Sequence, residues 1–175
     1  MKKDNIINLG RELIVKKGLD YLSVRKLSAH LDISVGYFYG RFPTMDKFVN
    51  AQNDVTLEEL LQELKNVKKT DDAYVNINRM ADVFVLYAKN NEVVWSLLSK
   101  SLSWQSSKSI TKVISYIDKE FSLLLKNMSV KQRKISTRLL VVSMFSVSNL
   151  LIDNPQDIKV LLNTYIAGLK VLESC

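Results

Sequence analysis

The stretch from Leu22 to Phe48, LSVRKLSAHLDISVGYFYGRFPTMDKF, constrains the fold more than any other part of the chain. Ser23 is a suitable N-cap for a helix over Val24–Leu31, because its hydroxyl can accept a hydrogen bond from an unpaired backbone N–H of the first turn. Asp32 is one of the few residue types that tolerate a left-handed turn. Ser34 can then cap a second helix. The stretch therefore predicts a helix, a tight turn and another helix.

The second helix is predicted over Val35–Phe42 and is short. Phe38 and Phe42 lie four residues apart, so they share one buried face. The other residues point elsewhere, and they are Val35, Gly36, Tyr37, Tyr39, Gly40 and Arg41. A helix with few core residues and many exposed aromatic or basic side chains is suited to contact a partner. In a helix-turn-helix, the second helix lies in the major groove of DNA.

These residues resemble the DNA-binding signature of the TetR-type transcriptional regulators of bacteria. The segments that carry the resemblance are Ser23–Ser28, Asp32–Ser34, Val35–Phe42 and Pro43–Phe48. With the helix upstream, the resemblance covers about the first fifty residues. It implies an all-α fold of about nine helices, with a three-helix DNA-binding domain over 1–48 and a helical domain for effector binding and dimerisation over 49–175. The implied function is a dimeric repressor that a small apolar or aromatic effector releases from operator DNA.

The resemblance also implies which residues contact DNA, and these are Ser23, Arg25, Lys26, Ser34, Val35, Gly36, Tyr37, Tyr39, Arg41 and Lys47. For the two serines, helix capping is an equally physical role. Arg25 can hold a guanine edge through two hydrogen bonds, or be an ordinary exposed arginine. Tyr37 replaces the usual small polar residue of the family. Met45 replaces a lysine that often grips phosphate, and Lys47 is expected to substitute for it.

The distribution of charge agrees with this interpretation. The chain has a formal net charge of +7, and residues 1–50 hold nine Lys and Arg against five Asp and Glu, or +4. The remaining 125 residues hold sixteen against thirteen, or +3. A basic excess at one end of the chain is typical of a surface that binds phosphates. A solvated basic surface is the alternative, and charge alone does not exclude it.

The helices that flank the helix-turn-helix are also predicted from the sequence. Apolar residues at helical spacing, which are Ile6, Ile7, Leu9, Leu13 and Ile14, form the buried stripe of a first helix that Gly18 ends. Gly10 stands where the family usually has Ala, which either weakens the helix by about 1 kcal/mol or permits a close approach. Thr44 is expected to cap a long helix that reaches about Lys68.

Five more helices are predicted, at about 73–90, 93–102, 110–128, 130–153 and 156–173. The family resemblance implies an effector pocket among the central helices, and its candidate lining residues are Met80, Phe84, Tyr87, Trp95, Trp104, Tyr116 and Phe121. Aromatic residues at helical spacing are also typical of an ordinary core, so both interpretations stay open. Asp82 or Glu120 could select a cationic effector, although exposure to solvent is the default for a charge.

The last two helices are expected to form a dimer interface. The uncharged run Leu139–Ile152 offers apolar residues around most of its circumference, more than its own chain easily covers. The candidate interface residues are Leu139, Val142, Ser146, Leu150, Thr164, Ala167, Gly168 and Val171. Two such helices from each subunit would make a four-helix bundle. A fully buried core within one subunit is the alternative.

Several classes of protein are disfavoured. One cysteine, Cys175, cannot form an internal disulfide, which fits a reducing cytoplasm. The chain opens with no signal segment, and its longest uncharged run is too short to span a membrane. His30 is expected on the surface, and no residue cluster suggests catalysis, a metal or a cofactor. A helical enzyme is therefore the least supported alternative, and a DNA-binding regulator controlled by a protein partner is the stronger one.

Overall fold

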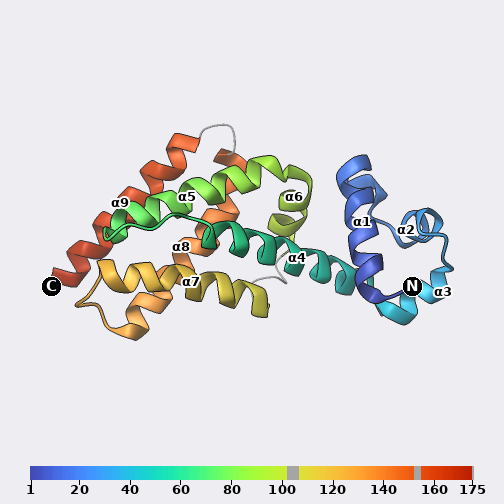
Figure 1. The fold of residues 1–175 in the computed structure, drawn as a ribbon, viewed down its shortest axis with the longest axis horizontal. Helices are drawn as coiled ribbons and strands as arrows, with labels where there is room; N and C mark the ends of the chain where they lie inside the picture. The colour runs from blue at the N-terminus through green and yellow to red at the C-terminus, as the bar shows by residue number, and fades with distance from the viewer. Residues whose placement is uncertain (102–106, 152–154, 175) are drawn as a thin grey trace. The chain divides into compact units, whose positions relative to one another are not determined.

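The computed structural model describes residues 1–101, 107–151 and 155–174 (Figure 1). Side chains at 146–151, 155, 156, 158, 159 and 172–174 lie outside the description. Within these ranges the chain forms nine α-helices and one 3₁₀ helix and contains no strand, so the predicted all-α fold is confirmed. The chain divides into two compact units, Met1–Thr56 with Asn91–Trp104, and Leu57–Asn90 with Gln105–Cys175. The functional boundary expected after residue 48 stays a prediction.

The first unit contains α1 (Lys3–Lys17), η1 (Leu19–Tyr21), α2 (Val24–His30), α3 (Val35–Arg41), the first part of α4 (Met45–Lys65) and α6 (Glu92–Lys100). The second unit contains the rest of α4, α5 (Ala73–Asn90), α7 (Lys108–Leu124), α8 (Val130–Leu151) and α9 (Pro155–Ser174). The C-terminal ends of two helices were predicted too far along the chain. Helix α4 ends at Lys65 rather than at about Lys68, and α7 ends at Leu124 rather than near Met128.

Local capping explains where several helices begin and end. Gly18 ends α1 at φ 87°, a conformation that glycine adopts without strain, and its N–H donates to the carbonyl of Ile14. The Thr44 hydroxyl accepts from the N–H of Lys47 and so caps α4 as predicted. Asp72 caps α5 in the same way, since its carboxylate accepts from the N–H groups of the two residues Tyr74 and Val75.

Three phenylalanines form the centre of the core of the first unit. The ring centroids of Phe38 and Phe42 are 5.5 Å apart, those of Phe38 and Phe48 are 5.5 Å apart, and those of Phe42 and Phe48 are 5.2 Å apart. All three side chains are fully buried, and Leu27 and the predicted α1 residues Ile6, Ile7, Leu13 and Ile14 pack around them. The prediction for Leu9 was wrong: its side chain is 39% exposed, because it lies to one side of the buried stripe.

Gly10 is a point of close approach between α1 and Phe48. A Cβ atom built on Gly10 would lie 2.7 Å from Cζ of Phe48 and 3.5 Å from a methyl group of Leu27. Of the two interpretations of Gly10, the structure supports the close approach. The Phe48 ring cannot easily move away, because it packs against two other buried rings.

Gly10→Ala is expected to lower the free energy of unfolding by about 1 kcal/mol, because overpacking costs more than the helix preference of alanine returns. In a Phe48→Leu background, the same change should raise the free energy of unfolding, since the added methyl group no longer meets a ring. Denaturant unfolding of the wild type, both single variants and the double variant measures the two effects. If Gly10→Ala changes the free energy of unfolding in the same direction in both backgrounds, the steric explanation is wrong.

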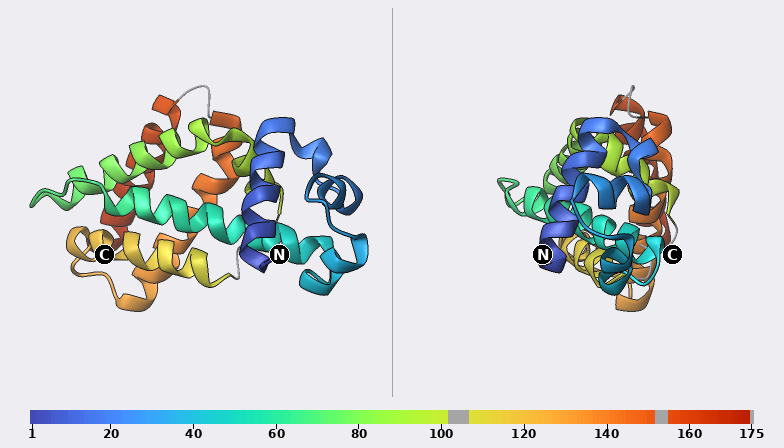
Figure 2. Two further views of the ribbon diagram at one scale, coloured as in Figure 1. Left: turned by 45° about the vertical axis from the view of Figure 1, so that its right-hand side comes forward. Right: turned by 90° about the vertical axis from the view of Figure 1, so that its right-hand side faces the viewer.

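Four helices of the second unit surround a common apolar core. Helix α5 packs against α7 and α9, and α8 packs against the same two helices (Figures 1 and 2). The rings of Phe84 and Phe145 meet at the centre with centroids 4.8 Å apart. Hydrogen bonds also join neighbouring helices, as Tyr165 donates to the carbonyl of Ser136 at 2.8 Å.

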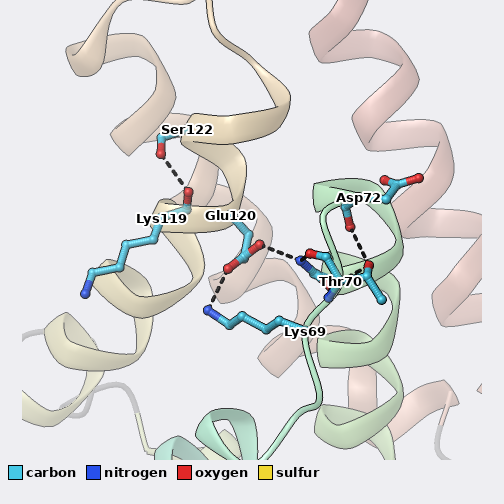
Figure 3. Close-up of polar contacts among 7 residues, drawn as sticks. Lys69, Thr70, Asp72, Lys119, Glu120 and Ser122 are labelled. Atoms are coloured by element: carbon cyan, nitrogen blue, oxygen red, sulfur yellow. Dashed lines mark hydrogen bonds and ion pairs between the residues drawn. The ribbon is translucent and has the colours of Figure 1, made fainter.

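A buried carboxylate ties the connection between α4 and α5 to α7 (Figure 3). Glu120 is 3% exposed, and it accepts hydrogen bonds from Lys69 Nζ at 2.6 Å and from Asn76 Nδ2 at 3.1 Å. The expectation that Glu120 is an exposed charge was therefore wrong. The hydrogen bond to Glu120 raises the pKa of Lys69, because it stabilises the ammonium form. A carboxylate already paired in this way holds the fold together rather than selecting an effector.

A second buried carboxylate joins α7 to α8. Asp118 is 8% exposed and accepts from both Arg133 Nε at 3.1 Å and Arg133 Nη2 at 3.4 Å. The hydroxyl of Thr137 donates to the same carboxylate at 3.2 Å. With an arginine and a hydroxyl as partners, this charge is satisfied where it lies.

Candidate nucleic-acid interface

Helices α2 and α3 and the turn between them have the geometry of a helix-turn-helix. The Ser23 hydroxyl accepts from the N–H of Lys26, and the Ser34 hydroxyl accepts from the N–H of Tyr37 at 3.0 Å. Asp32 between the helices has φ 51°, so the predicted left-handed turn is confirmed. Both serines act as helix caps, and their hydroxyls lie on the surface at helix N-termini. A capped N-terminus also presents backbone N–H groups that suit a phosphate.

The outer face of α3 carries few large side chains near its start. Val35 is 41% exposed and Tyr39 is 45% exposed, whereas Phe38 lies in the core. A Cβ atom built on Gly36 would meet only the Ser34 hydroxyl, at 3.9 Å, and one built on Gly40 would meet nothing within 4 Å. Gly40 was not among the predicted contacts, yet it lies one turn from Gly36. Two glycines on one exposed face allow the backbone of the helix to come close to another surface.

The basic residues of α2 differ in their surroundings. Arg25 is exposed, as its predicted role at a base edge requires. Lys26 is also exposed, but its ammonium group donates to the carbonyl of Asp20 at 2.8 Å and lies 4.8 Å from the ring centroid of Tyr21. Lys26 would have to leave these partners to reach a phosphate. His30 is exposed, as predicted.

Tyr37 and Arg41 lie one turn apart on α3 and contact each other. The Arg41 guanidinium donates to the Tyr37 hydroxyl at 3.2 Å and lies 5.2 Å from the ring centroid of Tyr37. The amino group of Met1 donates to the same hydroxyl at 2.8 Å, and the hydroxyl donates to the Met1 carbonyl at 2.7 Å. The hydrogen bonds from the Met1 amino group and from Arg41 lower the pKa of Tyr37, because both donors stabilise the phenolate form.

The start of α4 explains one departure from the family pattern. Met45 is partly buried and packs against the aromatic core, so it serves the fold. Lys47 is exposed in the first turn of the helix, and its predicted phosphate contact stays a prediction. Lys3, which was not predicted, places its ammonium group 4.9 Å from the ring centroid of Phe42, at the end of α3. Only the contact between these distant residues reveals Lys3, because no local sequence pattern marks it.

The predicted effector residues do not all come together. Met80, Phe84 and Phe121 line one small apolar cavity of about 20 Å³, together with residues such as Met144 and Leu162. Tyr87 instead donates to Glu59 at 2.6 Å, and the Tyr116 ring lies against Lys69. Trp95 is buried in α6 of the other unit, and Trp104 lies outside the described residues. The cavity has room for about one water molecule and is far smaller than a typical ligand site.

A larger hollow of about 310 Å³ lies open to solvent between α7 and α8. Its lining includes the apolar side chains Ile114 and Ile135 and the charged side chains Lys134 and Arg138. This hollow was not predicted, because neither aromatic residues nor a motif mark its lining in the sequence. The described residues hold no group of three or more His, Cys, Asp or Glu side chains placed to bind a metal ion.

The predicted dimer face is exposed in the single chain. On α8, Leu139 is 57% exposed, whereas Val142, one turn further along, is partly buried. On α9, Val171 is 63% exposed, and the small residues Thr164, Ala167 and Gly168 are exposed with it. Leu161 on α9 is also exposed, at 37%. The side chains of Ser146 and Leu150 lie outside the description.

None of the helices in the described part of the chain has the length and apolar character that a membrane span requires.

Comparisons with known proteins agree with this geometry. Residues 6–51 match the model of the family described as bacterial regulatory proteins, tetR family. The fold is similar to that of BioQ, solved with its double-stranded DNA operator, at a TM-score of 0.77 and 16% identity over 97% of this chain and 98% of that chain. It is also similar to RolR solved without ligand, at a TM-score of 0.74 and 15% identity over 98% and 96% of the two chains.

A third similar structure is a TetR variant from Acinetobacter baumannii in complex with minocycline, at a TM-score of 0.61 and 16% identity over 100% of this chain and 99% of that chain. No curated protein sequence matches the chain. The N-terminal match and the fold of the described helices agree with each other, and both agree with the helix-turn-helix formed by α2 and α3. Residues 6–51 therefore form an N-terminal domain of the tetR family of bacterial regulatory proteins, and the described helices have a TetR-like fold.

Proposed function

We propose that this protein is a sequence-specific transcriptional regulator that binds operator DNA as a homodimer and represses transcription until an effector releases it. The observation that carries the proposal is the surface of α3. Phe38 and Phe42 anchor the helix in the core, and Val35, Gly36 and Tyr39 remain exposed on a helix-turn-helix. A helix presented in this way fits the major groove, where base edges can be distinguished.

The DNA contacts divide into two kinds. We expect Val35 to pack on a thymine methyl group and Arg25 to hold a guanine through two hydrogen bonds. Tyr39, Arg41 and the capped helix N-termini contact phosphates, which fix the position of the protein without reading the sequence. Both kinds of contact are needed, because the first gives specificity and the second gives most of the affinity.

Dimerisation through α8 and α9 completes the proposal. The exposed side chains Leu139 and Val171 and the partly buried Val142 would leave water on dimerisation, and the small residue Gly168 would let a partner helix approach closely. BioQ has been solved on a double-stranded operator, and a two-fold operator requires two joined recognition helices. The centres of its half-sites would lie roughly 34–36 Å apart, or a multiple of that distance.

The last element of the proposed function is the effector. The TetR variant from Acinetobacter baumannii binds minocycline, and a small apolar or aromatic effector is proposed for this chain. The cavity near Phe84 and Phe121 would have to grow before it could accept such a molecule. Met80 and Met144 in its lining are unbranched and adaptable, so they can move with little strain.

The size of this cavity favours a second candidate, in which a protein partner rather than a small molecule controls the regulator. A central core that is already filled needs no effector to complete it. Thermal unfolding in the presence of apolar and aromatic compounds separates the two candidates. An increase in melting temperature that accompanies release of DNA supports the small-molecule effector. If no compound binds the protein or releases it from DNA, at any concentration that leaves the protein folded, the result supports control by a protein partner.

Selection of bound duplexes from a random pool tests the proposed function directly. We expect a two-fold symmetric sequence to be enriched, and its affinity to fall steeply as salt rises, because bound phosphates release counterions. A protein that enriches no sequence and shows no salt-sensitive binding to any duplex would disprove the proposal.

Arg25→Ala is expected to remove discrimination of about 1–3 kcal/mol at one base pair of each half-site, because the bidentate contact to guanine is lost. Relative affinities for a series of single-base-pair changes in the selected operator measure this effect. Arg11→Ala is a matched control, since Arg11 donates to Thr56 within the first unit. A profile for Arg25→Ala that equals the wild-type profile would remove the assignment.

A further inference from the structure

The hydroxyl of Tyr37 makes three hydrogen bonds at the surface of α3. It accepts from the Met1 amino group at 2.8 Å and from Arg41 at 3.2 Å, and it donates to the Met1 carbonyl at 2.7 Å. A phenol has one hydrogen to donate and two lone pairs. The hydroxyl is therefore fully used, and any bond from it to a base edge would require one of these three contacts to break.

The same contacts bring positive charges together at the end of α3. Arg41 stacks on the Tyr37 ring, with 5.2 Å between the guanidinium and the ring centroid. Lys3 lies over the ring of Phe42, which follows α3 directly, and Lys2 is exposed beside it. The residues Met1–Lys3 and Arg41, here named the basic edge, thus lie together next to the recognition helix. None of them contributes to the buried core.

A tyrosine is well suited to organise such an edge. Without the hydroxyl, the segment before α1 would lose its hydrogen bonds to α3, and Arg41 would lose one of the groups that restrict its rotamers. A cationic side chain that is already held in one rotamer loses less conformational entropy when it binds. Contacts from such groups to phosphates position a protein on a duplex and do not read its sequence.

We propose that Tyr37 is a positioning residue, which holds the basic edge in place to bind DNA phosphates, and that it does not read a base. This inference rests on the proposed function, because it assumes that α3 lies in a DNA groove. It assigns the segment Met1–Lys3 to the DNA interface, although neither the helix-turn-helix motif nor the predicted contacts include it. It also leaves base reading on α3 to the residues at its start.

The test is Tyr37→Phe, which removes the hydroxyl and keeps the ring. We expect the slope of log affinity against log salt to fall by about one unit, because about one phosphate contact is lost. When salt rises from about 50 mM to about 200 mM, the affinity of both proteins should fall, and the factor by which it falls should be roughly 3.5 times smaller for the variant than for the wild type. Relative affinities across single-base-pair changes in the operator should stay the same. Tyr21→Phe is the matched control, since this exposed tyrosine lies outside the basic edge.

Two further measurements separate positioning from base reading and from misfolding. Replacing Lys2 and Lys3 together by Ala should lower the salt slope, and adding Tyr37→Phe to that variant should lower it by less than in the wild type. In the free protein, Tyr37→Phe should speed amide exchange at Ile6, whose N–H donates to the carbonyl of Lys2 at 3.3 Å. This readout needs no DNA, so it still tests the contacts if the proposed function itself fails.

Either of two results would overturn the inference. A wild-type salt slope in Tyr37→Phe, measured on a wild-type protein that binds its operator, would show that the hydroxyl holds no phosphate-binding group. A changed preference at one base pair would show that Tyr37 reads a base. If the wild-type protein binds no duplex, the proposed function fails first, and unchanged exchange at Ile6 would then reject the positioning role as well.

Discussion

Gly168→Arg is expected to abolish dimerisation and operator binding together while the single chain stays folded. A Cβ atom built on Gly168 meets no other atom within 4 Å, so in the monomer the new side chain extends into solvent. In the proposed dimer the same side chain would enter an apolar contact that includes Val171 and Leu139, and it would leave a charge buried without a partner. Such a charge costs several kcal/mol, and two-fold symmetry would place one on each subunit.

Sedimentation velocity, helix content by circular dichroism and operator binding measure the three consequences of this change. Gly168→Ala is the matched control, because a methyl group still permits close approach and alanine favours the helix by about 1 kcal/mol. We expect the control to remain dimeric and to bind the operator. If Gly168→Arg also sediments as a dimer, the interface lies elsewhere on the molecule.

The local structure of the first unit was predictable because it depends on residues close in sequence. Ser23 and Ser34 each bond to an N–H three residues ahead, and Asp32 supplies the left-handed turn between their helices. These contacts need only the right residue types at the right spacing. The resemblance to the tetR family rests on the same residues, and residues 6–51 match the family model.

Burial was harder to predict where it depends on elements far apart in sequence. Leu9 fits the helical period of α1, yet its side chain is 39% exposed, since periodicity gives the direction of a buried face but not its width. Glu120 was expected in solvent because a charge usually lies there, whereas Lys69 and Asn76 hold it in the interior. The partners of Glu120 are 51 and 44 residues away, so no local pattern points to them.

The candidate sites show the same division. Helical spacing predicts which residues are exposed on α3. The contacts of Tyr37 with Met1 span 36 residues, so only the structure reveals them. In the central core, Met80, Phe84 and Phe121 do come together as predicted. The space left between them depends on how Met144 and Leu162 pack from two other helices, and the sequence contains no measure of that space.

Phe38→Ala is expected to unfold α3 and to abolish DNA binding while dimerisation is retained. Phe38 is fully buried, and its ring lies 5.5 Å from those of Phe42 and Phe48 and 6.1 Å from that of Tyr39. Removing such a ring costs about 3–5 kcal/mol, which is a large fraction of the total stability of a small unit. Amide exchange should accelerate in α2 and α3, whereas α8 and α9 should stay protected.

Phe38→Leu is the control, because it keeps an apolar side chain in the core and should leave operator binding measurable. Since Phe38→Ala keeps the face that includes Gly168, it should form mixed dimers with wild-type chains, and each mixed dimer presents only one intact recognition helix. Adding the variant to the wild type should therefore reduce operator binding. The double variant Phe38→Ala, Gly168→Arg should not inhibit operator binding by the wild type, because it cannot form mixed dimers. Inhibition that persists in the double variant would mean that the chains meet through another surface.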